Sequence, residues 1–130
     1  MPLIKIHLLE GAWTAADQAV LLDVVHDVMV ESFRVPTTDR YQLLTERPRG
    51  HIRALDTGLG YDRSDRFVLM EVVSRPRARD DKVRFYRRLS EVLGEVCGLA
   101  PDDLMISMVT NDDEDWSFGR GEAEFVTGKL

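Results

Sequence analysis

The sequence predicts an α/β fold, an α+β sandwich in which two β-α-β repeats form a four-stranded sheet with two helices on one face. The chain has 130 residues, which suits one domain. Two proline residues, Pro36 and Pro101, each stand between a predicted helix and a predicted strand, 65 residues apart. The same shift moves the apolar stretch 3–9 onto 68–74. We therefore assign residues 1–130 to a single domain, with repeat one at about 2–46, repeat two at about 66–110 and a tail at 111–130.

The first repeat begins with residues 3–9, whose mostly apolar sequence predicts a strand. Thr14, followed three residues later by Asp17, resembles a capping box and predicts the start of a helix that runs to about Phe33. A short second strand is expected at 40–45. The apolar face of the helix is predicted from residues at three- and four-residue spacing, namely Val20, Leu21, Val24, Val25, Val28 and Met29.

The second repeat begins with the apolar strand 67–73. A helix from about Asp80 to Cys97 follows, and Gly98 suits its C-terminal cap. The fourth strand is expected at 104–109. The apolar face of this helix is predicted to carry Val83, Tyr86, Leu89, Leu93 and Val96.

The two repeats leave one face of the sheet without cover inside the chain. Each β-α-β unit joins parallel strands by a right-handed crossover, which places both helices on the same face. The strands 3–9 and 67–73 are nevertheless apolar at nearly every residue, as strands buried on both faces are. The sequence therefore predicts an oligomer in which sheets of several subunits face inward.

The composition excludes several classes of protein. A net charge of −6 and a pI near 5.0 argue against nucleic acid as a partner, because binding phosphates needs a basic face. No apolar run approaches the ~20 residues of a membrane span, and no secretion signal precedes the domain. One cysteine and three scattered histidines predict neither a disulfide nor a metal site. The glycines of the loop 55–63 lack the strand–helix context of a dinucleotide site, so we expect no cofactor. The absence of a membrane span and of a secretion signal, with the single cysteine, leads us to expect a cytoplasmic protein.

The amino terminus offers the first candidate for chemistry. If Met1 is removed, Pro2 becomes a free secondary amine, which can serve as a proton donor, a base or a nucleophile. If Met1 stays, the same nitrogen is an amide and does none of these. A role for Pro2 in catalysis therefore depends on this processing step.

A second candidate lies just after the strand 67–73, where Arg75 and Arg77 flank Pro76. In an extended strand end the two arginines project to the same side and could grip one carboxylate; two solvated arginines are the alternative. If the first strands of the two repeats run antiparallel, this end lies beside Pro2. Asp39, at the start of the strand after the first helix, is a candidate for the same rim.

The tail supplies large apolar groups beyond the second repeat, chiefly Trp116, Phe118 and Phe125. They either pack on the core or a neighbouring subunit, or form the wall of a pocket. The residues themselves leave both interpretations open.

The chain resembles the tautomerase superfamily and, within it, the malonate semialdehyde decarboxylase family. The resemblance rests on the Pro2 start, the two repeats, and the segments at 36–42, 56–63, 73–77 and 115–121, of which S-R-P-R and W-S-F-G-R-G are the most specific. It implies a MIF-like fold and a homotrimer. It also implies that Pro2 is the catalytic amine and Asp39 its acidic partner. Arg75 and Arg77 would bind the substrate carboxylate, beside an apolar wall of Trp116, Phe118, Phe125 and Leu130.

The activity that the resemblance implies is a cofactor-independent carbon–carbon lyase reaction on a small anionic oxo acid. Malonate semialdehyde would give acetaldehyde and carbon dioxide, with Pro2 acting either as a protonated hydrogen-bond donor or through an iminium ion. Asp39 could hold Pro2 protonated or activate water, and the second role predicts hydratase side activity. Two alternatives remain: a keto–enol tautomerase, hydratase or dehalogenase with the same site, and a non-catalytic trimeric binding protein.

Overall fold

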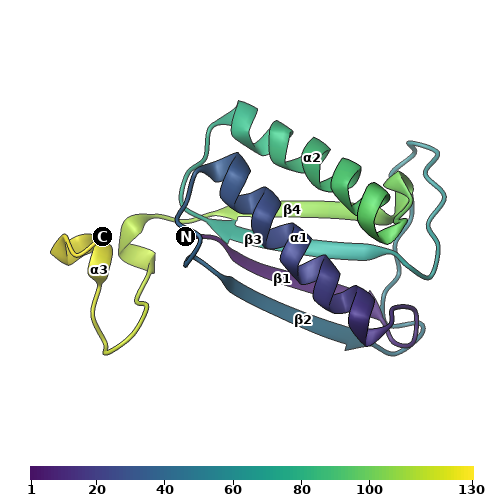
Figure 1. The fold of residues 1–130 in the computed structure, drawn as a ribbon, viewed down its shortest axis with the longest axis horizontal. Helices are drawn as coiled ribbons and strands as arrows, with labels where there is room; N and C mark the ends of the chain where they lie inside the picture. Colours follow the sequence, from purple (N-terminus) through teal and green to yellow (C-terminus); the bar gives the residue numbers. More distant parts are fainter.

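The computed structural model describes all of residues 1–130 as one sheet, two long helices and a short tail (Figure 1). Every predicted strand and helix is present within one or two residues of its predicted bounds, whereas η2 and α3 of the tail were not predicted. The elements in chain order are β1 (Leu3–Leu9), α1 (Ala15–Phe33), β2 (Tyr41–Arg47), β3 (Val68–Ser74), α2 (Arg79–Cys97), the 3-10 turn η1 (Pro101–Asp103), β4 (Leu104–Thr110), the 3-10 turn η2 (Asp113–Asp115) and α3 (Glu124–Thr127).

The sheet has the strand order β2-β1-β3-β4, so the first strands of the two repeats lie in its centre. Within each repeat the two strands are parallel, whereas β1 and β3 are antiparallel. Leu3, the first residue of β1, lies opposite Val73 near the end of β3 and opposite Tyr41 at the start of β2. The antiparallel pairing confirms the condition on which the predicted neighbourhood of Pro2 and the Arg75–Arg77 segment depended.

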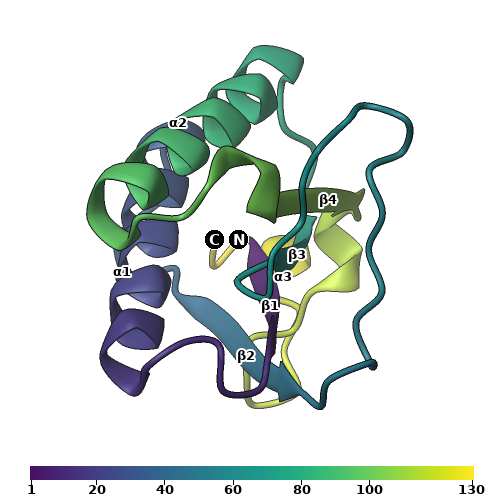
Figure 2. The ribbon, with the colours of Figure 1, turned by 90° about the vertical axis from the view of Figure 1, so that its right-hand side faces the viewer.

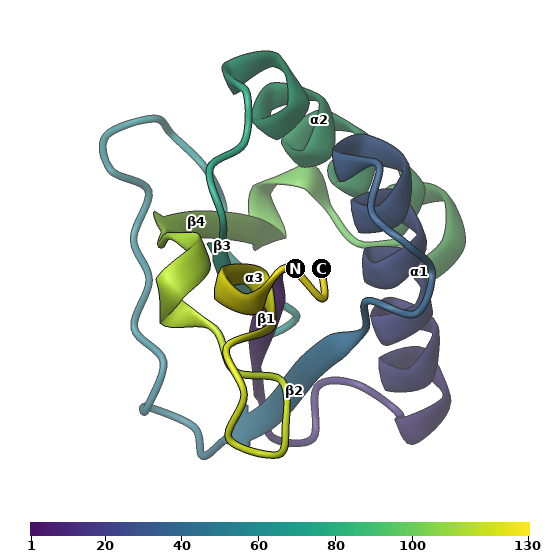
Figure 3. The same cartoon turned by 90° about the vertical axis from the view of Figure 1, so that its left-hand side faces the viewer.

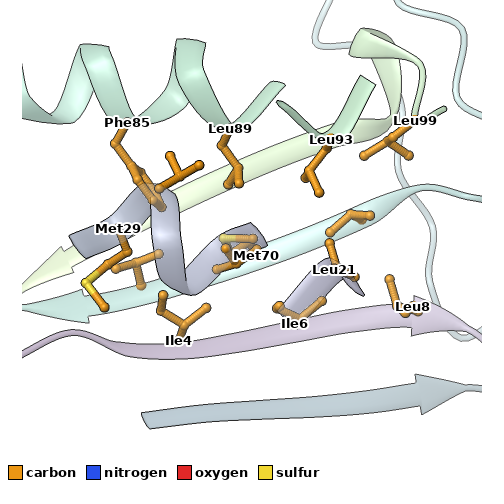
Figure 4. Packing of buried hydrophobic residues seen from close by; sticks show 14 of the residues in the cluster. Ile4, Ile6, Leu8, Leu21, Met29, Met70, Phe85, Leu89, Leu93 and Leu99 are labelled. Carbon is orange, nitrogen blue, oxygen red and sulfur yellow. The ribbon is translucent and has the colours of Figure 1, made fainter. Parts of the chain in front are cut away.

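Both long helices cover the same face of the sheet, as predicted (Figures 2 and 3). Alternate residues of β1, namely Ile4, Ile6 and Leu8, point into the space between sheet and helices (Figure 4). The sixteen buried residues of this core are Ile4, Ile6, Leu8, Trp13, Leu21, Val25, Val28, Met29, Phe33, Val68, Met70, Val72, Phe85, Leu89, Leu93 and Leu99. The core is thus one layer, and it stabilises the sheet from one side only.

The helix ends follow their predicted chemistry. The Thr14 hydroxyl accepts a hydrogen bond from the Asp17 backbone N–H at 3.1 Å, which satisfies one of the free donors at the start of α1. At the end of α2, Gly98 has a φ of 64°, a left-handed conformation that favours glycine, and its N–H bonds to the Leu93 carbonyl.

The predicted apolar face of α2 needs a correction. Leu89 and Leu93 are buried as expected, but Val83 and Val96 are each 55% exposed and Tyr86 is 36% exposed. The largest side chain that α2 buries is Phe85, which stacks at 5.0 Å between ring centroids on Phe33 of α1. The buried line of the helix therefore runs through Phe85, Leu89 and Leu93 rather than through Val83.

The opposite face of the sheet is open, and it is less apolar than the strand sequences suggested. Its centre carries His7 of β1, which hydrogen-bonds Thr45 of β2 and Glu71 of β3, both at 2.7 Å. Apolar side chains flank this polar group; the exposed ones on the strands are Tyr41, Leu43, Met105 and Val109. The loop from 48 to 67 arches on this side of the sheet (Figure 2). The prediction that further subunits cover the face stays a prediction.

The far end of the sheet, where β3 begins, is closed by side chains that tie the loop to the second repeat. Asp103 is buried and accepts hydrogen bonds from Ser64, at 2.7 Å from its backbone N–H and 2.6 Å from its hydroxyl. Arg66 lies over the Trp13 ring, with its guanidinium carbon 4.3 Å from the ring centroid, and donates to the Cys97 carbonyl at 3.0 Å. None of these side chains has a buried polar atom without a hydrogen-bond partner.

None of the helices is long and apolar enough to cross a membrane.

Candidate active site

The near end of the sheet brings together the start of β1, the end of β3 and the tail (Figure 3). A cavity of about 760 Å³ opens there. It is lined by the Arg75–Pro76–Arg77 segment, by the acidic residues 112–114 that follow β4, and by Val126. The cavity therefore joins positive side chains from one strand end with negative side chains from its neighbour.

The amino-terminal amine lies at this end. Met1 is present in the structure, so the free amine belongs to Met1, and Pro2 is buried behind it. Burial, with the positive charge of Arg77, lowers the pKa of the amine from 8.0 to about 6, while the negative charge of Asp39 acts in the opposite direction. The amine, both predicted arginines and Asp39 thus lie close enough to influence one another's charge.

Asp39 is buried, with 6% of its surface exposed, at the turn between α1 and β2. The turn is held by a hydrogen bond from the Asp39 N–H to the Pro36 carbonyl at 3.0 Å, and by one from His26 Nε2 to the Thr37 carbonyl at 2.9 Å. One carboxylate oxygen, Oδ2, has no hydrogen-bond partner in the protein. An unpaired buried acceptor is costly, which is typical of a group that serves a ligand or a catalytic partner.

Arg77 is fixed by protein contacts. Its Nε donates to the Ser74 hydroxyl at 2.9 Å, and its guanidinium carbon lies 5.2 Å from the centroid of the Phe33 ring. Burial and the nearby charge of Arg75 lower the pKa of the Arg77 guanidinium. Two adjacent cations in a half-buried site favour the binding of an anion between them.

Arg75 is held from two directions by the tail. Its Nε and Nη2 donate to the two oxygens of Asp113 at 2.5 and 3.1 Å, and the Phe125 ring covers its face with the centroid 4.2 Å from the guanidinium carbon. Asp113 was not among the predicted site residues.

The predicted wall residues form one aromatic cluster. Trp116 stacks on Phe118 with 5.5 Å between centroids and 9° between planes, and Phe118 meets the edge of Phe125 at 5.6 Å. Tyr41 of β2 adds a fourth ring, 5.6 Å from Phe118. Leu130 stays 59% exposed at the chain end, where its N–H bonds to the Glu124 carbonyl. Of the four predicted wall residues, three are joined to one another, and Phe125 connects them to Arg75.

Asp113, Ser74 and Tyr41 were not predicted from the sequence. For Asp113 a signal was available: β3 and β4 were expected to be parallel, so the residues after β4 follow those after β3 at the same sheet edge. The register confirms it, with Ser74 opposite Thr110 and the Asn111 N–H bonded to the Ser74 carbonyl at 2.9 Å. The acidic run at 112–115 therefore had to lie beside Arg75 and Arg77.

This set of groups suits a small monoanionic ligand. Two guanidiniums can bind a carboxylate, an amine can bond or attack a carbonyl, and a buried carboxylate can hold or receive a proton. No group of three or more His, Cys, Asp or Glu side chains is arranged to hold a metal ion.

Comparison with known proteins gives consistent matches along the whole chain. Residues 39–119 and residues 2–61 match two families that are both described as tautomerase enzyme. Among curated proteins, the probable tautomerase YrdN of Bacillus subtilis (strain 168) is 48% identical, with all of both chains aligned. The probable tautomerase YusQ of the same strain is 28% identical over 97% of this chain and 99% of its own length.

Two solved structures are similar in both sequence and shape. A malonate semialdehyde decarboxylase, studied for its decarboxylase and hydratase activities, has a TM-score of 0.95 and 48% identity over 98% of either chain. A second malonate semialdehyde decarboxylase, inhibited by 3-bromopropiolate, has a TM-score of 0.93 and 36% identity, covering 98% of this chain and 97% of its own. A symmetric trimer named fused 4-OT, at 19% identity, shares the fold with a TM-score of 0.77 over 97% of this chain and 98% of its own.

Proposed function

The chain belongs to the tautomerase superfamily, and on this premise we propose that it decarboxylates a 3-oxo acid, malonate semialdehyde, to acetaldehyde and carbon dioxide. One observation carries the proposal: the charges of Asp39, Arg75 and Arg77 all act on the amino-terminal amine, and the two arginines line the cavity at this end of the sheet. The similarity to malonate semialdehyde decarboxylase, at 48% identity, supports the choice of substrate.

The first step of the proposal is the removal of Met1, which turns Pro2 into the free amine. Pro2 directly precedes β1, and β1 pairs with β3 in antiparallel register, so the new amine stays at the sheet end that carries the two arginines. Arg75 and Arg77 bind the substrate carboxylate and hold it out of the plane of the aldehyde group. In that orientation the carbon–carbon bond that breaks is aligned with the carbonyl π system.

The electrons of the broken bond then pass through the new C2–C3 double bond onto the carbonyl oxygen, and carbon dioxide leaves. The protonated Pro2 amine stabilises the developing enolate by a hydrogen bond to this oxygen. A proton added to C2 gives acetaldehyde. The unpaired oxygen of Asp39 suits a neighbouring N–H donor and favours the charged amine. Burial and the charge of Arg77, which lower the pKa of the Met1 amine to about 6, favour the neutral amine that an iminium path needs, so the proposal keeps both paths.

The aromatic cluster of Trp116, Phe118 and Phe125 contacts the face of the Arg75 guanidinium through the Phe125 ring. In the proposal it forms the apolar wall of the substrate site, with Leu130 at its margin. An apolar environment around the leaving carboxylate favours the neutral product, carbon dioxide, over the anion.

We further propose that the protein is a homotrimer. The open face of the sheet carries exposed apolar side chains, among them Leu43, Met105 and Val109, on both sides of the polar group around His7. Exposed apolar residues gathered on one face of a sheet favour burial in an interface. The similar fold of a protein described as a symmetric trimer supports the same assembly.

A second candidate function uses the same groups. The 48% identical relative is named a probable tautomerase, and the amine with Asp39 could move a proton between carbon and oxygen, or activate water for hydration or dehalogenation. A non-catalytic trimeric binding protein is the third possibility, and retention of Met1 would favour it strongly, because the nitrogen of Pro2 is then an amide.

Two measurements test these proposals. The intact mass of the native protein shows whether Met1 is present, and a chain that keeps Met1 contradicts every mechanism based on a Pro2 amine. Turnover of malonate semialdehyde is then compared with that of phenylenolpyruvate and of 3-haloacrylates. We expect decarboxylation to be the fastest reaction and to fall at least about 100-fold in Pro2→Ala. Decarboxylation no faster than in buffer, with rapid ketonisation of phenylenolpyruvate, would establish the tautomerase instead.

A further inference from the structure

The guanidinium of Arg75, which the proposed function assigns to the substrate carboxylate, already binds a carboxylate of the protein. Both carboxylate oxygens of Asp113 accept hydrogen bonds from the Nε–Nη2 edge of Arg75, at 2.5 and 3.1 Å. This paired geometry is the one in which arginine binds a free carboxylate ligand. A substrate that uses the same edge has to replace Asp113.

The pair is built so that Asp113 can leave. Its side chain is 50% exposed, and it belongs to η2, a single turn whose capping bonds are made by Asp112 and Asp115. The Phe125 ring, at 4.2 Å from the guanidinium carbon, contacts the face of Arg75 and does not depend on Asp113. The contact with Phe125 therefore remains to hold Arg75 when the carboxylate swings into water.

The charges of the site favour exchange over simultaneous binding. With Asp113 in place, the four carboxylates of Asp39 and of the acidic residues 112–114 already outnumber the two guanidiniums and the one amine, so a substrate carboxylate would add to an excess of negative charge. Residues 112 and 114, both acidic, line the same cavity. Replacing Asp113 by the substrate leaves the net charge around the amine unchanged, whereas adding the substrate to it does not.

We propose that Asp113 is a resident competitor for the substrate carboxylate: it occupies Arg75 in the free protein and is displaced when substrate binds. It thus determines specificity by setting the affinity for monocarboxylates, without touching the reacting atoms. This inference rests on the assignment of Arg75 in the proposed function. Because partly exposed ion pairs are weak, the competition lowers the apparent affinity about two- to fivefold.

The test compares the processed wild-type protein with Asp113→Asn and with the control Glu114→Gln. Both variants remove one negative charge from the lining of the same cavity, but Glu114 makes no ion pair with Arg75, so the control subtracts the general effect of charge. Propionate, which has the carboxylate but no carbonyl, is titrated while the Nε–Hε signal of Arg75 is followed by NMR. Unchanged thermal unfolding establishes that both variants are folded.

We expect propionate to bind Asp113→Asn about two- to fivefold more tightly than wild type, and more tightly than Glu114→Gln. Before propionate is added, the Nε–Hε signal of Arg75 in Asp113→Asn should differ from that in wild type, as expected for a guanidinium that has lost its bonded carboxylate. Equal or weaker binding by Asp113→Asn, or equal tightening by Glu114→Gln, overturns the proposal. So does a titration in which the Arg75 signal never shifts.

The kinetic form of the test is a lower KM in Asp113→Asn, by the same factor, with kcat unchanged. A purely structural role of Asp113 would instead lower kcat or stability. The propionate titration needs no turnover, so tighter propionate binding in a protein without decarboxylase activity would refute the proposed function and leave the role of Asp113 standing. Decarboxylase activity together with equal propionate affinities of wild type and Asp113→Asn would support the proposed function and refute the role of Asp113.

Discussion

Two buried aspartates stand at corresponding places in the two repeats and meet different fates. Asp39 precedes β2 and Asp103 precedes β4, each in the turn after a long helix. Because β1 and β3 are antiparallel, the two turns lie at opposite ends of the sheet. Asp103 accepts two hydrogen bonds from Ser64, whereas Oδ2 of Asp39 has no partner.

The difference separates a structural carboxylate from a candidate functional one. Asp103 contributes stability because donors within the chain form hydrogen bonds to its carboxylate and compensate the cost of burying it. Asp39 is buried with Oδ2 unpaired, and its charge acts on the amine and on Arg77, which lines the cavity together with Arg75. The two ends of one sheet thus use the same residue type for different purposes, and substitutions at both ends should separate these purposes.

The largest effect is expected at the near end. Asp39→Asn should lower kcat/KM for malonate semialdehyde about 100-fold or more, because the group that pairs with the amine loses its charge. Its free energy of unfolding should change by less than about 1 kcal/mol, since the charge removed was incompletely paired. Steady-state kinetics and denaturant unfolding measure the two quantities, and kcat/KM within threefold of wild type would contradict the assignment.

The next largest effect compares arginines at the two ends of β3. Arg75→Ala should raise KM about 10- to 100-fold, because a charged hydrogen-bond partner of the substrate is lost. Arg66→Ala removes a similar contact with an aromatic ring at the far end, and it should leave KM unchanged. Initial rates over a range of substrate concentrations decide the matter; equal values of KM in the two variants would remove Arg75 from the site.

A smaller effect, on stability alone, is expected at the far end. Asp103→Asn replaces an acceptor oxygen of a buried carboxylate by a donor that faces the Ser64 N–H or hydroxyl. The free energy of unfolding should fall by about 1–3 kcal/mol. The rate per folded molecule should stay the same, and a loss of activity beyond the loss of folded protein would show that the far end takes part in function.

The smallest effect concerns the pH dependence of stability. With Met1 present, the pKa of the amine is about 6 in the folded protein against 8.0 ordinarily, so the unfolded chain binds more protons between pH 8 and 6. The free energy of unfolding should therefore fall as the pH is lowered through this window. Asp39 raises the pKa of the amine, so Asp39→Asn should steepen the fall, while Asp103→Asn should not. Denaturant unfolding of the three unprocessed proteins at several pH values measures this dependence. The same slope of the free energy of unfolding against pH in all three would contradict the prediction.

The sequence predicted the fold well because its signals are local. A run of apolar residues, a Thr14 cap, a Gly98 stop and a turn at Pro101 each act within a few residues of chain, and the structure places the elements accordingly. The rotation of α2 was predicted less well. Periodicity shows that one side of the helix is apolar, but the contact between Phe85 and Phe33 selects which line of that side faces the core.

The candidate site depended on more distant relations. The 65-residue repeat led to the expectation that Arg75 and Arg77 lie near Pro2, on the condition that β1 and β3 are antiparallel, and the register meets this condition. The ion pair of Asp113 with Arg75 depended in addition on the path of the tail after β4. The roles of Pro2, Asp39 and the wall residues stay predictions until the variants are measured.

The sequence by itself determined the elements, their repetition and the identity of the charged groups, because these follow from local hydrophobic patterns and from residue type. Only the tertiary structure decided which aspartate would be satisfied. That outcome depends on which donors the folded chain brings near: Ser64 reaches Asp103 from a loop that returns across the far end, whereas no protein donor reaches Oδ2 of Asp39. Such meetings of residues far apart in the chain are set by strand register and loop path, which no short stretch of sequence encodes.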